Sequence, residues 1–365
     1  MLLLKNFGWR YTYHYLWFTF VNFHMVPATA FKSKKLRNLW FKIFSRIEPY
    51  PRFIEVETTT NCGLRCVMCE HTYWKEKNKN MTFKQFKYIV DQFPKLYWIG
   101  VTGIGESYLN PDFNKMLRYI KKERKAYIEM YDNMFYMNDK DIEELVKLKV
   151  DKLIISIDAC TKKTYEKIRK GSNFERVVKN IKKLHETKKR LNSDFPEIDF
   201  HFIVSKYNIH EILPYIDFVK SLGVEDYTEI LFTTLLHRYK EVKNIYVTIP
   251  KSVVNKANKR AEKLKIRLIW NRNVPPPTKR CHVRYCTAWT EPFFFVTGHV
   301  TPCCALNEAN EREFQKNTSF GNIFEKPFKE IWDSPGYKRL RREIRSGKLP
   351  YECRHCTIYH PKGIE

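Results

Sequence analysis

The pattern that most constrains this chain is a regular alternation of strand-like and helix-like stretches between residues 52 and about 235. The run KLIISID at Lys152–Asp158 is short and apolar, which is typical of a strand buried on both faces. The stretch after Thr82 instead places apolar residues at helical spacing, at Phe86, Ile89, Val90 and Phe93. Alternation of these two patterns predicts a parallel sheet with helices packed outside it.

Six such strand-and-helix units can be counted. The expected strands are Phe53–Glu57, Leu96–Thr102, Tyr127–Asp132, Lys152–Asp158, Ile198–Val204 and Tyr227–Leu235. Six units are too few for a complete eight-fold barrel, so we predict an α/β fold, a partial (β/α)6 TIM-like barrel. Its working face is expected at the carboxyl ends of the strands. After about residue 240 the alternation is expected to stop, and the prolines at 275–277 mark a break.

The chain is therefore divided into four parts. Residues 1–50 form an aromatic and basic amphipathic segment, 51–235 the partial barrel, 236–280 a linker with a helix, and 281–365 a small Cys-rich domain. In this last part Thr297-Gly298 predicts a hairpin turn. Helices are expected at Lys326–Trp332 and Tyr337–Arg345.

Nine of the ten cysteines fall into two groups, one early and one late. Clustered thiols in a long chain are more often metal ligands than disulfides, and ligand thiols must stay reduced, which favours the cytoplasm. Cys62, Cys66 and Cys69 are spaced as CxxxCxxC directly after a strand. Three thiolates on one loop can bind three irons of a [4Fe–4S] cube and leave the fourth iron open. Structural zinc is the alternative, but it prefers four ligands, and the motif offers three with His71 close by.

This motif, the strand before it and the βα series after it resemble the radical S-adenosylmethionine (SAM) superfamily. In that family the open iron chelates SAM, and an electron from the cluster cleaves SAM to methionine and a 5′-deoxyadenosyl radical. The radical then removes a hydrogen atom from the substrate. The resemblance implies a SAM-binding [4Fe–4S] cluster, SAM itself, and a reducing partner such as ferredoxin or flavodoxin. It assigns no catalytic side chain.

The resemblance also implies SAM-binding residues. TGIGES resembles the family's Gly-Gly-Glu motif, in which Gly105 lets the backbone approach and Glu106 receives the methionine ammonium, although Ile104 stands where a glycine is usual. Asn133 in YDNM and Ser156 in SID match further positions, and Met68 lies where the adenine would pack. Asp158 is read as a cap of the following turn.

The late cysteines resemble the C-terminal extension called SPASM, or its shortened twitch form. That resemblance implies one auxiliary [4Fe–4S] cluster on Cys286, Cys303, Cys353 and Cys356, where Cys304 could replace Cys303 and Cys281 could join. Four cysteine thiolates are also a standard zinc set, which stays open as an alternative. Cys160 is interpreted as a small buried apolar residue.

The net charge of the chain indicates which kinds of molecule it could bind. Lys and Arg number 66 against 40 Asp and Glu, a formal net charge of +26. Such a charge favours anionic partners, although dispersed lysines on solvated helix faces give the same total. Residues 31–47 form a basic amphipathic helix that either lies on an anionic membrane surface or packs on the main domain.

The sequence thus predicts a radical SAM oxidoreductase or modifying enzyme. It would abstract hydrogen from an unidentified, anionic substrate: a peptide, a sugar or alcohol, or a lipid headgroup. A cluster- or zinc-stabilised nucleic-acid-binding protein is the alternative. The chain shows no specific nucleic-acid motif and no dense basic stripe, which counts against it.

Overall fold

A computed structural model describes residues 50–74, 76–223, 228–234, 242, 244–271, 290–304, 312–346 and 350–353. Several expectations lie outside these residues. They are the amphipathic helix at 31–47, the proline break at 275–277, and the cysteines Cys281, Cys286 and Cys356.

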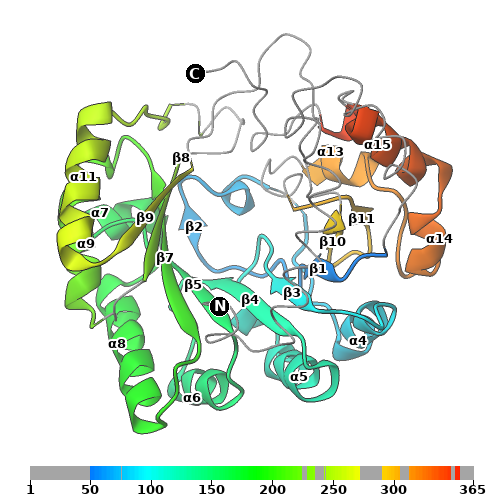
Figure 1. Ribbon diagram of the computed structural model, residues 1–365, viewed down its shortest axis with the longest axis horizontal. Coiled ribbons are helices and arrows are strands. Elements are labelled where there is room, and N and C mark those ends of the chain that lie inside the picture. The colour runs from blue at the N-terminus through cyan, green and yellow to red at the C-terminus, as the bar shows by residue number, and fades with distance from the viewer. Residues whose placement is uncertain are drawn as a thin grey trace, which may run out of the picture.

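A curved, mostly parallel sheet forms the centre of the molecule, and helices cover its outer face (Figure 1). Its strands lie in the order β11-β10-β1-β3-β4-β5-β7-β8-β9. Seven strands from β1 to β9 in this order pair in parallel: β1 (Phe53–Val56), β3 (Trp98–Val101), β4 (Tyr127–Asp132), β5 (Lys152–Ser156), β7 (Glu197–Val204), β8 (Glu229–Thr234) and β9 (Arg267–Asn271). The predicted partial barrel is therefore confirmed, with its curvature open on one side.

Four of the connecting helices begin where the sequence supplies a side-chain cap. Thr82 and Gln85 form a reciprocal capping box at the start of the first helix, and Asn138 and Asp141 form another. Thr161 and Asn173 accept backbone N–H groups at two further starts. The helices are α4 (Phe83–Asp91), α5 (Phe113–Tyr119), α6 (Asp139–Lys147), α7 (Lys162–Ile168), α8 (Phe174–Arg190), α9 (Ile212–Ser221) and α11 (Lys251–Leu264).

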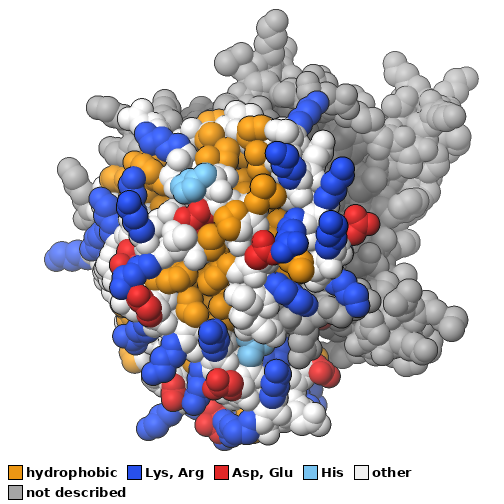
Figure 2. All heavy atoms as spheres, turned by 90° about the vertical axis from the view of Figure 1, so that its left-hand side faces the viewer, with side chains coloured by type: hydrophobic (Ala, Val, Ile, Leu, Met, Phe, Trp, Pro, Cys, Tyr) orange, Lys and Arg blue, Asp and Glu red, His pale blue; other side chains and the backbone are white. Residues whose placement is uncertain are grey.

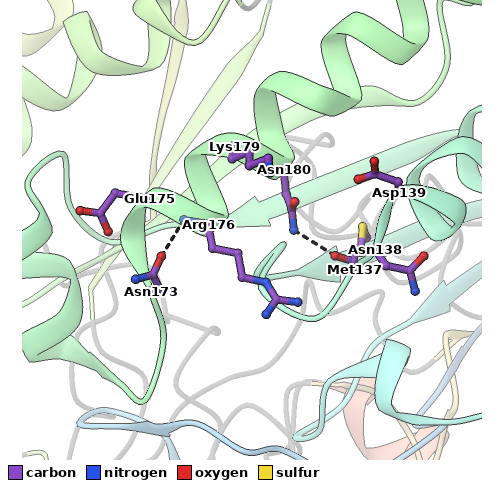
Figure 3. A pocket seen from close by; sticks show the side chains of 8 residues that line it. All are labelled: Met137, Asn138, Asp139, Asn173, Glu175, Arg176, Lys179 and Asn180. Carbon is purple, nitrogen blue, oxygen red and sulfur yellow. Dashed lines mark hydrogen bonds between the residues drawn. The ribbon is translucent and has the colours of Figure 1, made fainter.

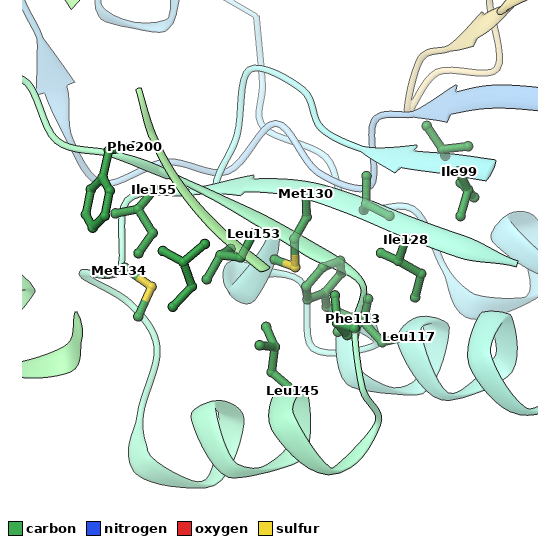
Figure 4. Packing of buried hydrophobic residues seen from close by; sticks show 14 of the residues in the cluster. Ile99, Phe113, Leu117, Ile128, Met130, Met134, Leu145, Leu153, Ile155 and Phe200 are labelled. Atoms are coloured by element: carbon green, nitrogen blue, oxygen red, sulfur yellow. The ribbon is translucent and has the colours of Figure 1, made fainter. Parts of the chain in front are cut away.

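The core lies between the sheet and these helices (Figure 4). Side chains alternate along β4: Ile128 and Met130 are fully buried toward the helices, and the alternate residues Tyr127, Glu129 and Tyr131 are partly buried on the inner side of the sheet. Phe113, Leu117 and Leu145 of α5 and α6 pack against this buried row. The barrel interior is thus left to the polar and aromatic side chains of the alternate positions.

The expectation that the alternation ends near residue 240 is wrong. Helix α11 packs against α9, and β9 then adds a further parallel strand beside β8. The apolar face of α11, with Val254, Ala257 and Ala261 buried, explains why it stays on the barrel. Its many lysines hid this face in the sequence, because they give the segment a polar composition.

The Cys-rich segment continues the sheet at its other edge. β10 (Phe293–Phe294) pairs in parallel with β1, and β11 (Val300–Thr301) returns antiparallel to β10. The predicted turn at Gly298 is confirmed by its φ of 88°, a conformation that favours glycine. α13 (Arg312–Asn317), α14 (Phe328–Trp332) and α15 (Pro335–Ser346) follow, the last two at the predicted places.

One face of the molecule shows how the charge is distributed there. On the face formed by the left-hand side of Figure 1, Lys and Arg are spread among hydrophobic and acidic side chains rather than gathered in one block (Figure 2). In the described part of the chain, no helix is both long and apolar enough to span a membrane.

Candidate functional site

The three early cysteines lie on a loop that leaves the carboxyl end of β1. Two short strands fix this loop: β2 (Arg65–Cys66) pairs antiparallel with β6 (Arg169–Lys170), and the Val67 N–H donates to the Ile168 carbonyl at 2.9 Å. The Cys66 carbonyl accepts from the Cys69 N–H at 3.1 Å. A hydroxyl also donates to it, from Thr72 Oγ1 at 2.7 Å. The loop therefore has a defined backbone path.

The thiols share one apolar surrounding. Cys66 belongs to a buried cluster with Leu64, Met68 and Ile168, and Cys62 and Cys69 pack against that cluster. Burial raises the pKa of the Cys62 thiol to about 12 and that of Cys69 to about 11, and it raises the pKa of Cys66 as well. Buried thiols ionise when a metal compensates the charge of the thiolate. The donor set is therefore one that fits an iron–sulfur cluster.

His71 does not extend this set. Its Nε2 lies 2.9 Å from the Thr60 carbonyl oxygen and 3.2 Å from Asn78 Oδ1, so that the ring is tied to the neighbouring backbone. Among the described residues, no three His, Cys, Asp or Glu side chains surround one point closely enough to hold a single metal ion. A four-iron cube does not require the thiolates to surround a single point, because each thiolate binds its own iron.

Gly105 and Glu106 stand directly against the cysteine loop. The Glu106 N–H donates to the Asn61 carbonyl at 2.8 Å, and its carboxyl interacts electrostatically with the Cys62 and Cys69 thiols. A Cβ atom at Gly105 would lie 2.5 Å from the Thr59 carbonyl oxygen and 2.8 Å from that of Asn61. Only glycine permits this approach, because the backbone oxygens cannot move aside cheaply.

A second carboxyl accompanies Glu106. Burial, and then the neighbouring Asp132, raise the pKa of Glu106 well above its usual range, while Arg169 opposes the rise. Burial also raises the pKa of Asp132 to about 7. Asn133 lies beside Glu106 and directs its backbone N–H and its side-chain amide toward that carboxyl; its Oδ1 accepts from the Phe135 N–H at 2.8 Å. A polar ligand here could engage the Asn133 amide and either carboxyl.

The strand β5 ends in Ser156, which is partly exposed and pairs across the sheet with His201. The expectation that Asp158 caps the next turn is wrong. Its Oδ2 accepts from Arg169 Nε at 2.7 Å, and its Oδ1 accepts from the Ile203 N–H at 2.7 Å. Arg169 was not singled out in the sequence, because a lysine- and arginine-rich chain offers no signal that one cation is buried.

Polar and aromatic side chains line the inner wall next to Ser156. His201 Nε2 lies 3.0 Å from Thr233 Oγ1, and the ring of Tyr131 meets the His201 ring edge-on at 5.9 Å. Burial lowers the pKa of His201 to about 4, so that the imidazole is neutral near pH 7. Sequence reasoning missed these residues, and only the inward alternation along the strands could have found them.

The late cysteines are described in part. Cys303 follows β11 and is buried beside Tyr337 of α15, and Cys304 is next to it. Cys353 packs against the main apolar core near the end of the described chain. Its neighbour Glu352 is buried and accepts from Arg339 of α15, which holds this turn in place. Cys286 and Cys356 lie outside the described residues, so the predicted four-cysteine set is described only in part.

Cys160 is less apolar than expected. It packs against the core, but its Sγ donates to Glu211 Oε2 at 3.2 Å and its backbone N–H donates to the same oxygen at 2.7 Å. Glu211 also accepts from the Thr161 hydroxyl at 2.5 Å. The thiol is therefore part of the polar network that joins the starts of α7 and α9.

A pocket of about 590 Å³ lies apart from these groups, between the starts of α6 and α8 (Figure 3). Two of its amide side chains are engaged: Asn173 caps α8, and the Asn180 amide donates to the Met137 carbonyl at 3.0 Å. None of the predicted site residues lines it.

Two family models match different parts of the chain. Residues 56–219 match the family model described as the radical SAM superfamily, and residues 286–357 match SPASM, an iron–sulfur cluster-binding domain. A tungsten-containing aldehyde ferredoxin oxidoreductase cofactor-modifying protein of Pyrococcus furiosus is 29% identical, over 84% of this chain and 87% of its own. An AdoMet-dependent heme synthase of Methanosarcina barkeri is 24% identical, over 80% and 85%.

Solved structures share the fold. Streptococcus suis SuiB bound to its precursor peptide SuiA aligns with a TM-score of 0.62 at 17% identity, over 89% of this chain and 74% of its own. The enzyme anSMEcpe with bound AdoMet aligns with a TM-score of 0.59 at 15% identity, over 84% and 83%. At these identities the structural similarity establishes the fold and does not identify the substrate.

Proposed function

Because the chain belongs to the radical SAM superfamily and carries a C-terminal SPASM domain, we propose that it cleaves SAM at the early cysteine loop to abstract hydrogen from an anionic substrate. The observation that carries the proposal is the common placement of Cys62, Cys66 and Cys69 in one apolar cluster, with Glu106 against it. When the [4Fe–4S] cluster and SAM are bound, one electron yields methionine and the 5′-deoxyadenosyl radical that takes the substrate hydrogen.

The residues around the loop bind SAM in this proposal. Glu106 receives the ammonium of the methionine moiety, and Gly105 gives the backbone room to approach it. The Asn133 amide and the Ser156 hydroxyl donate to SAM oxygens. Met68, which is buried in the cluster, packs at the adenine. The apolar surrounding excludes water from the reacting atoms.

The SPASM domain implies auxiliary iron–sulfur chemistry at the other end of the chain. We assign its ligands to Cys286, Cys303, Cys353 and Cys356. Two of the four lie in the described part of the chain: Cys303 follows the hairpin that extends the sheet, and Cys353 follows Glu352, which accepts from Arg339.

The charge next to the loop supports an anionic substrate. Tyr207 packs against the cysteine-bearing cluster, and two exposed ammonium groups flank its ring: Lys167 Nζ at 4.5 Å and Lys206 Nζ at 5.5 Å from the ring centroid. The names of the two relatives that match over most of this chain refer to cofactor modification and heme synthesis. SuiB instead binds a precursor peptide. We therefore narrow the substrate to a carboxylated organic cofactor, with a peptide as the second candidate.

A reducing partner completes the reaction. Ferredoxin or flavodoxin in the cytoplasm would deliver the electron. Nothing in the described residues or in the matched families supports the nucleic-acid-binding alternative, and contact of residues 31–47 with a membrane remains a prediction outside the described residues.

The substrate class can be tested by hydrogen transfer. Cells grown in deuterated medium supply an anaerobic extract, which is separated by anion exchange into retained small molecules, retained peptides and an unretained fraction. Reduced enzyme with SAM should form deuterated 5′-deoxyadenosine with the retained small molecules. Deuterium from the retained peptides would favour the second candidate. Deuterium from the unretained fraction alone would contradict an anionic substrate.

A further inference from the structure

Glu57, the residue after β1, connects three parts of the chain through one buried carboxylate. Its side chain is fully buried. Its Oε1 accepts from Arg312 Nη2 at 2.6 Å and, at the longer distance of 3.4 Å, from the Ile104 N–H. Its Oε2 accepts from the Val296 N–H at 3.1 Å. One carboxylate thus joins the Gly103–Glu106 turn, the hairpin of β10 and β11, and helix α13.

Arg312 makes the reciprocal set of contacts. It opens α13, its side chain is 7% exposed, and its guanidinium carbon lies 4.9 Å from the ring centroid of Trp74 and 4.6 Å from that of Phe295. Its backbone N–H donates to Glu70 Oε1 at 3.2 Å. Glu70 and Trp74 follow Cys69 in the chain, so Arg312 holds the far end of the cysteine loop.

The local sequence makes room for this arrangement. A Cβ atom at Gly103 would lie 2.6 Å from Cγ of Glu57 and 3.3 Å from its Cα. Because the Cα atom directly follows β1, which is paired on both sides, it cannot shift easily to accept a larger residue. Gly103 therefore lets the turn that contains Glu106 lie directly on Glu57.

We propose that the Glu57–Arg312 pair is a positioning joint, through which the C-terminal domain sets the geometry of the cysteine loop and of the turn that carries Glu106. Arg312 acts through Glu57 and Glu70 and touches none of the predicted SAM ligands. The inference rests on the proposed function only for the identity of the bound group. The mechanical part, ordering of the loop by α13, stands on the contacts themselves.

Two features favour positioning over simple stabilisation. A buried ion pair returns little net stability, because the desolvation of both charges offsets their attraction. Its fixed geometry nonetheless orders every group that bonds to it, and here those groups come from segments more than 200 residues apart in sequence. The rings of Trp74 and Phe295 on the guanidinium add directional contacts.

The test compares Arg312→Met with Lys316→Met, a matched change one turn later in α13, where Lys316 forms a partly exposed pair with Glu76. Hydrogen exchange is followed by mass spectrometry in peptides covering residues 57–74 and 103–106, and SAM affinity is measured on the reconstituted enzyme. Arg312→Met should speed exchange in both peptides about ten-fold and weaken SAM binding by about the same factor, and Arg312→Lys should restore part of each. Lys316→Met should change neither.

If Arg312→Met folds poorly, a double variant allows the same exchange measurement on a folded protein. Glu57→Gln combined with Arg312→Met leaves no unpaired buried charge, so it should fold, yet exchange in both peptides should stay fast. Wild-type exchange rates in these peptides in either folded variant would overturn the joint. If the wild-type enzyme bound no SAM while Arg312→Met still exchanged faster, the proposed function would be wrong. The positioning joint would stand in that case, because the exchange measurement needs no SAM.

Discussion

Arg169 donates from Nε to Oδ2 of Asp158 at 2.7 Å, and the two side chains are 8% and 0% exposed. The pair lies beside the cysteine loop, because Arg169 belongs to β6 and pairs there with Cys66. Asp158→Asn removes the charge that compensates the guanidinium while keeping the shape of the side chain. Loss of one partner from a buried pair should lower the free energy of unfolding by about 3–5 kcal/mol, measured by anaerobic urea denaturation.

Lys162→Met is the matched control for that prediction. Lys162 pairs with Glu175 at the same distance of 2.7 Å, but both side chains are more than half exposed. Solvent screens such a pair, so its loss should leave the urea midpoint unchanged. Equal midpoints for the two variants would show that the buried pair contributes no more than the exposed one.

Gly105→Ala tests the close approach of the Glu106 turn to the cysteine loop. The new methyl group would meet two backbone carbonyl oxygens at 2.5 and 2.8 Å, so the turn must shift. SAM affinity, measured by equilibrium binding, should fall at least about ten-fold, the result of losing ~1.4 kcal/mol of binding free energy. Gly336→Ala serves as the control, because its methyl group would lie at an ordinary 3.5 Å from the Phe320 ring and should leave SAM affinity unchanged. Unchanged SAM affinity in both variants would contradict the role of Gly105.

Much of this architecture follows from local sequence patterns. The capped helix after Thr82, the buried strand that begins at Lys152 and the turn at Gly298 each follow from residues close together in the chain, and each is found where expected. Long-range partners could not be predicted in the same way. The pairing of Asp158 with Arg169 depends on how a loop folds back onto a strand, and that of Glu57 with Arg312 on how the last domain docks.

Asp132 predicts a pH dependence of stability. Burial raises its pKa from the unfolded value of 3.8 to about 7, so the folded protein binds a proton that the unfolded chain has released. The contribution of Asp132 to stability is therefore fully present below pH 3.8 and is lost as the pH rises toward 7. Asp132→Asn, which carries no titrating group, should lack this loss. Between pH 5.5 and 7.0 the wild-type free energy of unfolding should fall relative to the variant and then level off; a constant difference across that range would contradict the assignment.

The auxiliary ligands predict a metal count. With two cubes the reconstituted enzyme should hold about eight irons, and changing Cys353 and Cys356 together to Ala should remove about half of them. Cys160→Ala is the control. The Cys160 thiol donates a hydrogen bond to Glu211 and is not a predicted metal ligand, so this variant should keep the wild-type iron content. Iron and zinc are counted by mass spectrometry of the metals. If the wild-type protein held only about four irons and zinc in addition, the late cysteines would be a structural zinc site.

The measurement that bears most directly on the account is the formation of 5′-deoxyadenosine by the anaerobically reconstituted, reduced enzyme with SAM. The wild-type protein should form it together with methionine. A variant with Cys62, Cys66 and Cys69 all changed to Ala should form none, because it offers no thiolates to the SAM-binding cluster. If the triple variant formed 5′-deoxyadenosine at the wild-type rate, the three cysteines would not hold the cluster that cleaves SAM, and the central claim would be wrong.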